Sequence, residues 1–358
     1  MREEECREGE IAPQISDILL SMKLALKMTP QRSTQYANMV ETLAAPELLA
    51  SPVGAAIKEV VSVTFAGQSY LLTALDEEQV KQPQEIMPIL SRLGATSEVY
   101  EYFAEIGDVE GPLLRPLEPQ FTAFVPLEMA EVRRYKGKTN EVFTQVLLNI
   151  AIFAGSYADR FTERLRILDP LAGGGTTLFL ALAAGYDAFG IEAQKQDVET
   201  TAVFVRQYFH SEHVSYKEID ERGRRAGRRY LFEVGSKGAT RMLVLAHGDS
   251  SQANIHMQEV PGGPRMHAIM GDLPYGIQHF GEIAGMLQKA LPVWEQMLLP
   301  GGTLALAWNA TRIERDSMIA LVEVHTHLKV RNDLPYTQFA HTVDRVIKRR
   351  DILVAVKS

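Results

Sequence analysis

Apolar and polar positions over residues 120–358 alternate in a way that is typical of a parallel sheet covered by helices. Short apolar runs of strand length are separated by stretches with helical periodicity. The runs that we assign to strands are 166–168, 188–191, 242–246, 268–270, 303–308 and 352–356. Strands buried on both faces read as continuous apolar runs, so this pattern predicts an open α/β domain with helices on both faces. The stretch from Thr326 onward is expected to add a C-terminal antiparallel strand pair.

The first 119 residues show a different mixture of patterns, which predicts a smaller mixed α+β region. Helices are predicted over 15–28, 35–45 and 98–106, with a shorter one inside 77–93. Pro30 and Pro46 are expected to end the first two. β-branched and aromatic residues on both sides of Ala66-Gly67 predict a hairpin over 60–72. A Pro/Gly-rich stretch from Gly111 to Pro119 marks the boundary, so we expect one unit over 1–119 and another over 120–358.

Composition restricts the class of protein more than its function. The chain of 358 residues is 46% hydrophobic and 23% charged, which excludes a disordered or collagen-like chain. No apolar run approaches the roughly 20 residues that cross a bilayer, and the acidic start lacks the pattern of a secretory signal. The single cysteine, Cys6, excludes an internal disulfide and a cysteine-based zinc site. We therefore expect a cytoplasmic protein without a bound metal or membrane partner; the composition leaves the oligomeric state open.

The net charge of −8 argues against a protein that coats duplex nucleic acid regardless of sequence. The charge is uneven, however, because residues 214–241 contain eight Lys or Arg and four acidic residues. We expect a basic β-hairpin insertion there, which either holds the phosphates of a nucleic acid or forms a solvated loop. Its candidate phosphate-binding residues are Arg222, Arg224, Arg225, Arg228 and Arg229.

Residues 167–192, ILDPLAGGGTTLFLALAAGYDAFGIE, carry the most specific pattern in the chain. A short strand leads into Asp169-Pro170, and a run of three glycines precedes a predicted helix. Glycines allow a sharp turn and a close approach of the backbone to a ligand, and the amides at the helix start face that ligand. The next strand ends in Glu192, a carboxylate placed to accept both hydroxyls of a ribose. A P-loop would need lysine after Gly175, and a dinucleotide fingerprint would need glycine at Leu178.

This stretch resembles the first motif of class I S-adenosylmethionine-dependent methyltransferases in its DPxAGxGTT form. With the downstream strands, the resemblance covers about residues 141–358 and implies a Rossmann-like doubly wound methyltransferase domain with S-adenosylmethionine as cofactor. The cofactor-binding residues that it implies here are Asp169, Pro170, Ala172, Gly173, Gly174, Gly175, Thr176, Thr177 and Glu192.

The resemblance also implies cofactor contacts outside this motif. Asp249, which follows the strand 242–246, would face the adenine ring; a polar turn cap is the alternative. Thr139 and Asn140 precede a predicted helix over 141–153 and would close over the methionine end of the cofactor. A simple helix N-cap accounts equally well for these two residues.

The tetrapeptide Asp272-Leu273-Pro274-Tyr275 follows the strand 268–270 and suits methyl transfer to an exocyclic amine. Conjugation with a ring delocalises the lone pair of such an amine. The Asp272 carboxylate and the Leu273 carbonyl can hold the amino hydrogens and so favour a pyramidal nitrogen. Pro274 fixes the turn, and the ring of Tyr275 can stack on a flat base. In-line placement of nitrogen and methyl group then supplies most of the rate.

The tetrapeptide is similar to the [D/N]PP[Y/F] motif of amino-methyltransferases that act on adenine, cytosine, guanine or glutamine amides, with Leu273 in place of the first proline. Its Asp, apolar, Pro, aromatic, Gly order is similar to that of the THUMP-associated tRNA guanine-N2 methyltransferases. The resemblance implies guanine N2 in tRNA or another structured RNA as substrate. Alternatives are a DNA adenine-N6 or cytosine-N4 methyltransferase, a protein glutamine methyltransferase and a catalytically silent cofactor-binding subunit. Residues 1–119 show no THUMP pattern, and their role is left open.

Overall fold

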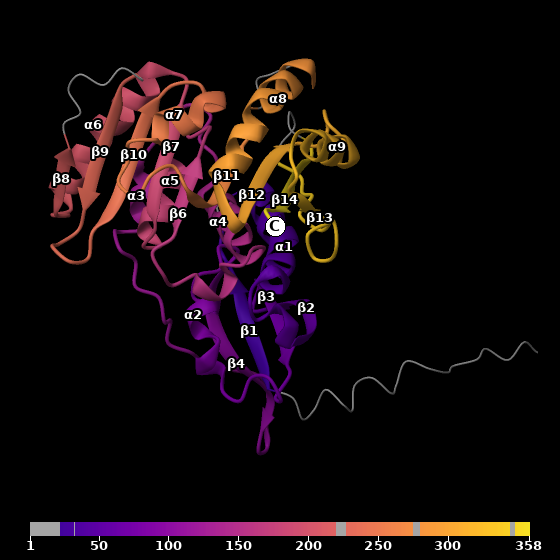
Figure 1. Ribbon diagram of the computed structural model, residues 1–358. Helices are drawn as coiled ribbons and strands as arrows, with labels where there is room; N and C mark the ends of the chain where they lie inside the picture. Colours follow the sequence, from indigo (N-terminus) through magenta and orange to yellow (C-terminus); the bar gives the residue numbers. More distant parts are fainter. Residues whose placement is uncertain (1–21, 32, 220–226, 275–279, 344–347) are drawn as a thin grey trace, which may run out of the picture.

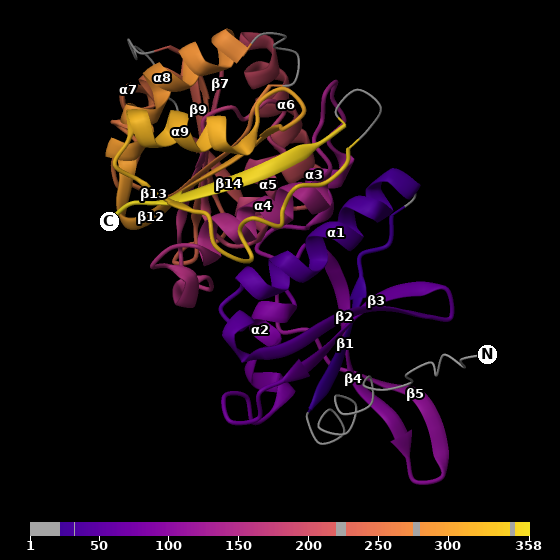
Figure 2. The ribbon, with the colours of Figure 1, turned by 90° about the vertical axis from the view of Figure 1, so that its right-hand side faces the viewer.

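The computed structural model describes residues 22–31, 33–219, 227–274, 280–343 and 348–358, which form two sheets (Figure 1). A five-stranded antiparallel sheet has the order β2-β3-β1-β4-β5, and a nine-stranded mixed sheet has the order β13-β14-β12-β11-β6-β7-β10-β9-β8. Figure 2 shows the smaller sheet, built by the N-terminal part of the chain, packed below the larger one. In the described part of the chain, no helix is long and apolar enough to cross a membrane.

The N-terminal sheet is covered on one face by a long helix. Its elements are β1 (Lys23–Met28), α1 (Thr34–Ala50), β2 (Ile57–Phe65), β3 (Gln68–Leu75), α2 (Met87–Leu90), β4 (Thr96–Ile106) and β5 (Val109–Pro116), with 3-10 turns at Gly54–Ala56 and Pro83–Glu85. Leu24 and Leu26 of the central strand β1 are fully buried in the core that also holds Leu43 of α1. The predicted hairpin is present, and it turns at Ala66 and Gly67, which both have positive φ angles.

Three sequence-based predictions for this region are wrong. Residues 23–28 are not helical, because β1 pairs with β3 on one side and β4 on the other. Residues 98–106 belong to strand β4 for the same reason: long-range pairing outweighs a local helical periodicity. Helix α1 does not end at Pro46 but continues to Ala50. Glu47, directly after that proline, is buried and accepts hydrogen bonds from the Gly94 and Ala95 amides at 2.9 Å each, which holds this last turn in place.

The larger sheet confirms the predicted α/β fold and the C-terminal antiparallel pair. Its strands are β6 (Arg166–Asp169), β7 (Asp187–Glu192), β8 (Tyr216–Ile219), β9 (Arg229–Val234), β10 (Arg241–His247), β11 (Met266–Asp272), β12 (Leu298–Asn309), β13 (Lys329–Arg331) and β14 (Arg350–Val356). The five central strands β12, β11, β6, β7 and β10 run parallel. β14 is antiparallel to both β12 and β13, and β9 is antiparallel to β10 and β8.

Helices cover both faces of this sheet, as a doubly wound fold requires. α3 (Glu128–Val132), α4 (Glu141–Phe153), α5 (Thr176–Ala183) and α6 (Lys195–Ser211) lie on one face, and α7 (Ala253–Met257), α8 (Phe280–Met297) and α9 (Arg315–His325) on the other. 3-10 turns are also present at Ala158–Arg160 and Ser250–Gln252. The apolar core of the first face is continuous with that of the N-terminal sheet. The two sheets therefore share one packed interior across residue 119.

The strand order places a crevice at the carboxyl ends of β6 and β11. The chain runs from β6 outward through β7 to β10, and then crosses back to β11 and β12 on the other side of β6. Open α/β sheets bind ligands where the order reverses in this way, because the adjoining loops diverge there. Asp169 and Asp272 are the last residues of these two neighbouring strands, and Glu192 is the last residue of β7.

Candidate functional site

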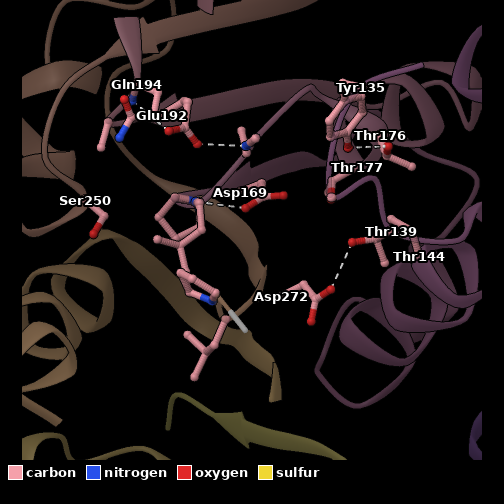
Figure 3. A pocket seen from close by; sticks show the side chains of 18 of the residues that line it. Tyr135, Thr139, Thr144, Asp169, Thr176, Thr177, Glu192, Gln194, Ser250 and Asp272 are labelled. Atoms are coloured by element: carbon pink, nitrogen blue, oxygen red, sulfur yellow. Dashed lines mark hydrogen bonds between the residues drawn. The ribbon is translucent and has the colours of Figure 1, made fainter. Parts of the chain in front are cut away.

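A cavity of about 910 Å³ opens at these strand ends (Figure 3), and its size falls within the range of about 300–1,000 Å³ that is usual for ligand sites. The predicted site residues that line it are Asp169, Pro170, Ala172, Gly173, Thr176, Thr177, Glu192, Asp249, Thr139, Asp272, Leu273 and Pro274. Residues that are far apart in the sequence thus meet around one space. Tyr275 lies outside the described residues.

Glu192 is held in the cavity wall by two backbone amides. One carboxylate oxygen accepts from the Gly173 amide at 3.0 Å, and the other accepts from the Gln194 amide at 2.7 Å (Figure 3). Each carboxylate oxygen has a second lone pair that can accept another hydrogen bond. The carboxylate is therefore oriented in advance for a ligand that presents two adjacent hydroxyls.

The other glycines of the loop shape it without lining the cavity. Gly175 has a φ of +91°, a left-handed conformation that favours glycine, and it is the N-cap of α5. A Cβ atom at Gly174 would overlap the ring of Tyr135. The Tyr135 hydroxyl forms a 2.8 Å hydrogen bond with Thr176, so this ring lies across the loop and joins it to the first turn of the helix.

Replacing Gly174 with alanine is expected to displace the Tyr135 ring and weaken ligand binding in the cavity. Overpacking of this kind costs about 1–3 kcal/mol. Tyr135→Ala in the same chain is expected to relieve the overlap. We therefore predict that the effect of Gly174→Ala on cofactor affinity, measured by titration calorimetry, is at least several-fold smaller in a Tyr135→Ala background. Equal effects in both backgrounds would contradict this packing.

Asp169 is a buried acid in the middle of the cavity wall. Its Oδ1 accepts from the Leu171 amide at 2.9 Å. The pKa of Asp169 is raised from 3.8 to about 7, mainly by burial and to a smaller extent by the neighbouring carboxylates of Asp272 and Glu192. Hydrogen bonds from Thr177 and Leu171 act against this rise. With Asp249, four acids line this cavity, which favours a ligand with positive charge.

Asp249 and Asn140 both act as turn caps, but only Asp249 lines the cavity. Asp249 accepts from the Ser251 amide at 2.8 Å, and this bond is the main reason why its pKa lies below the usual value. Asn140 accepts from the Phe143 amide at 3.1 Å, which makes it the N-cap of α4. Its amide group donates to Gln31 at 3.3 Å and so joins the N-terminal region to this corner. The N-cap interpretation of Asn140 is confirmed, and its expected contact with the cofactor stays a prediction.

Thr139 is directed at Asp272 (Figure 3). The Thr139 hydroxyl donates to Oδ2 of Asp272 at 2.9 Å, and the guanidinium of Arg350 lies 3.7 Å from the same oxygen. Arg350 is buried and its guanidinium stacks over the ring of Phe143 at 4.3 Å. The side chain of Asp272 is thus fixed from two sides. Leu273 is buried, with its amide bonded to the Ala307 carbonyl at 2.8 Å, so the backbone of the tetrapeptide is anchored to β12.

Sequence reasoning missed several residues of the site. Tyr135, Phe143 and Ser250 line the cavity, and Arg350 contacts Asp272 from β14. Tyr135 stands shortly before Thr139, which was itself expected at the site, so this short spacing was an available signal. The run of basic residues that ends in Arg350 carries no such signal, because pairing of β14 with β12 brings it to the site.

The described part of the basic insertion does not present free arginines. Arg222, Arg224 and Arg225 lie outside the described residues. Arg228 is exposed but pairs with Glu199 at 2.7 Å. Arg229 is buried, and its guanidinium donates to the His256 carbonyl at 2.6 Å, which corrects the expectation that it contacts phosphate. The predicted strands on both sides are present as β9 and β10. Within the described ranges, no group of three His, Cys, Asp or Glu residues can hold a metal ion.

No protein-family model matches the sequence, and no curated protein matches it significantly. Solved structures with a similar fold include TrmN from Thermus thermophilus (16% identity, 84% of this chain and 59% of that chain, TM-score 0.38). A methyltransferase homologue from Pyrococcus horikoshii is similar at 12% identity over 94% of this chain and 87% of that chain, with a TM-score of 0.40. Magnesium protoporphyrin IX methyltransferase from Synechocystis with bound SAM is similar at 12% identity over 60% and 80%, with a TM-score of 0.36.

The chain spans 59% of the length of the Thermus protein. At these identities and TM-scores, the similarities assign no activity to this chain. The doubly wound fold follows from its own strand order, and the function must be argued from its own cavity.

Proposed function

We propose that this chain is an S-adenosylmethionine-dependent methyltransferase that modifies an exocyclic amino group of a nucleobase, namely guanine N2 in tRNA or another structured RNA. One observation carries the proposal: the carboxylates of Asp169, Glu192 and Asp272 end three neighbouring strands and face one cavity beside a glycine-rich helix start. The similar structures from Thermus, Pyrococcus and Synechocystis include a TrmN and two proteins described as methyltransferases. They agree with the proposal, but the argument for it does not depend on them.

The residues present fit this cofactor. Glu192, with both oxygens already oriented by amides, would accept the ribose hydroxyls. The buried Asp169 would pair with the positive charge of the cofactor, which would favour its ionised form. Asp249 follows β10 in the cavity wall and would accept from the amine of an adenine. The cofactor would supply an electrophilic methyl group on a sulfonium, whose positive charge suits a cavity lined by four acids.

The raised pKa of Asp169 predicts how the affinity for the cofactor depends on pH. Without a ligand, Asp169 holds a proton below its pKa of about 7. A cation binds the ionised form, so binding must release this proton at lower pH. We expect the affinity for S-adenosylmethionine to rise from about pH 5.5 to about pH 7, by at most about tenfold per pH unit, and then to level off. The Asp169→Asn variant should bind S-adenosylmethionine weakly, and its affinity should not rise with pH. If the rise persists in this variant, the titrating group is not Asp169.

The same pKa predicts that the stability of the unliganded protein changes with pH in the opposite direction to its affinity for the cofactor. Because the folded state keeps a proton on Asp169 that the unfolded state loses near pH 4, the free energy of unfolding falls as pH rises from about 4 to about 7. Thermal or urea unfolding across this range, with Asp169→Asn as the matched control, measures the contribution.

The chemistry assigned to Asp272 is to bind and orient the nucleophile. Its carboxylate would accept a hydrogen from the amino group, which reduces conjugation of the lone pair with the ring. Transfer of the methyl group from sulfur to nitrogen would leave a positive charge on that nitrogen. Asp272 would stabilise this charge and would hold the proton that the nitrogen loses. Thr139 and Arg350 keep one carboxylate oxygen in place during these changes.

Transfer of label from S-adenosylmethionine to nucleic acids tests the proposal. The purified protein is incubated with labelled cofactor and, separately, with unmodified tRNA, ribosomal RNA, plasmid DNA and a protein extract. The proposal predicts label in RNA. Label confined to DNA would support the DNA methyltransferase alternative, and label confined to protein would support a glutamine methyltransferase. No label anywhere, with cofactor binding intact, would leave a catalytically silent subunit.

A further inference from the structure

The segment of residues 133–140 contains both cavity-lining residues and exposed basic residues. Tyr135, Gly137 and Thr139 line the cavity, whereas the alternate residues Arg134 and Lys136 are exposed. The segment contains four basic residues and no acidic one. These exposed cations are direct chain neighbours of the cavity-lining Tyr135 and Gly137. Arg134 and Lys136 therefore stand on the rim of the cavity.

A second basic segment reaches the same rim from the C-terminal part of the chain. Lys348 and Arg349 are exposed and directly precede Arg350, whose guanidinium lies 3.7 Å from Asp272. The Arg349 amide donates to the Thr311 hydroxyl at 3.0 Å, and this bond places Arg349 beside the loop with the exposed Arg312. Both segments therefore converge on Asp272, one through Thr139 and the other through Arg350.

Some of the basic side chains in the described ranges pair with a carboxylate, whereas the five near the cavity do not. Basic side chains that pair with a carboxylate include Lys27, Lys58, Arg115, Lys138, Arg160, Arg164, Lys195, Arg206, Arg228, Arg315 and Arg331. Arg134, Lys136, Arg312, Lys348 and Arg349, which we call the rim cations, make no ion pair with any acidic residue in the described ranges. Exposed cations beside a cavity can attract a polyanion even on a chain of net charge −8.

We propose that the rim cations form the docking surface for the sugar-phosphate backbone of the RNA next to the target nucleotide. The inference rests on the proposed function. A base that enters the cavity must leave its stack, and the backbone near it must then be held while the base is turned inward. Phosphate contacts from Lys and Arg position a nucleic acid in this way without reading its sequence. In the described part of the basic insertion, by contrast, Arg228 is paired with Glu199 and Arg229 is buried.

Charge reversal in pairs tests the docking surface. One variant carries Arg134→Glu with Lys136→Glu, and a second carries Lys348→Glu with Arg349→Glu. The matched control carries Lys217→Glu with Lys237→Glu; both lysines are exposed, and Lys237 lies in the turn between β9 and β10, at the opposite end of β10 from the cavity. Affinity for an unmodified tRNA transcript is measured by fluorescence anisotropy over a range of salt concentrations, and titration with S-adenosylmethionine checks that each variant is folded.

We expect each rim variant to bind the transcript at least tenfold more weakly than the wild type. The slope of log affinity against log salt should become shallower by about 0.7 for each phosphate that is no longer neutralised, or about 1.4 for each pair of substitutions. The control should bind within about twofold of the wild type. If the wild type methylates RNA but the rim variants bind the transcript normally, the rim cations are not the docking surface. The same conclusion follows if the control loses as much affinity as the rim variants. In both cases the proposed function stands. If the wild type transfers no methyl group to RNA, the proposed function fails and this inference fails with it.

Discussion

Asp272→Ala is expected to lower the rate of methyl transfer by about 10²–10³-fold while leaving the affinity for S-adenosylmethionine within a few-fold of the wild type. Removal of one preorganised group that stabilises charge in a transition state has an effect of about this size. Asp272 lies at the end of β11, beside the cofactor loop rather than within it, and its carboxylate is held by Thr139. Its loss should therefore affect kcat far more than cofactor binding. Single-turnover transfer and calorimetric titration measure the two separately.

Asp272→Asn provides the matched control for this result. The asparagine keeps the volume of the side chain and an oxygen that can accept from Thr139, but it removes the charge next to Arg350. We expect the rate of methyl transfer by this variant to fall to within about tenfold of the rate of the alanine variant, because the negative charge is what stabilises the developing ammonium. Near wild-type turnover by either variant, with cofactor binding intact, would remove Asp272 from the mechanism.

Glu192→Ala is expected to have the largest effect on cofactor binding, raising the Kd by roughly 10²-fold or more. Hydrogen bonds to a charged group contribute about 1.5–3 kcal/mol each, and two ribose hydroxyls are proposed to use this carboxylate. The change also removes the acceptor for the Gly173 and Gln194 amides, which loosens the glycine loop.

Two further variants separate these effects. Glu192→Gln keeps one oxygen acceptor and is expected to raise the Kd about tenfold. Glu199→Ala removes an acid from the neighbouring helix α6, where it pairs with Lys195 and Arg228 outside the cavity, and should leave the Kd unchanged. If Glu192→Ala binds S-adenosylmethionine as tightly as the wild type does, the ribose assignment is wrong.

The parallel sheet and the core of the site were predictable because their signals are local. A buried parallel strand is apolar along its whole length, and the carboxyl ends of such strands meet at one edge of the sheet. Asp169 and Glu192 follow such a run directly, and Asp272 follows one after Gly271, so the strand assignments indicated that these acids lie at one edge of the sheet. The roles of these residues stay predictions until they are measured.

The N-terminal strands were not predictable in the same way. Residues 98–106 alternate between aromatic, apolar and acidic side chains in a pattern that also fits a helix. What makes them a strand is pairing with β1, which lies far away in the sequence: Val99, for example, lies opposite Leu26. The surroundings of Asp272 pose the same problem. Arg350 reaches this acid because β14 pairs with β12, where Arg350 lies opposite Asn309.

Charge counting along the chain located basic residues but not their environment. The segment with the clearest surplus of Lys and Arg contains Arg228, which is neutralised by Glu199, and Arg229, which is buried. The rim cations come instead from three short segments that are far apart in the sequence. Only the fold brings these segments near Asp272, through the contacts of Thr139 and Arg350. A count of charges along the sequence therefore could not identify them as one group.

The mechanism requires that this cavity transfers a methyl group to the exocyclic amine of a base in RNA. Mass spectrometry can detect that product among the nucleosides of tRNA and, separately, of plasmid DNA, each incubated with labelled S-adenosylmethionine and either the wild type or Asp272→Asn. We predict labelled N2-methylguanosine with the wild type and a large loss of it with the variant. Intact cofactor binding without any labelled nucleoside, or label only in N6-methyladenine or N4-methylcytosine from DNA, would contradict this mechanism.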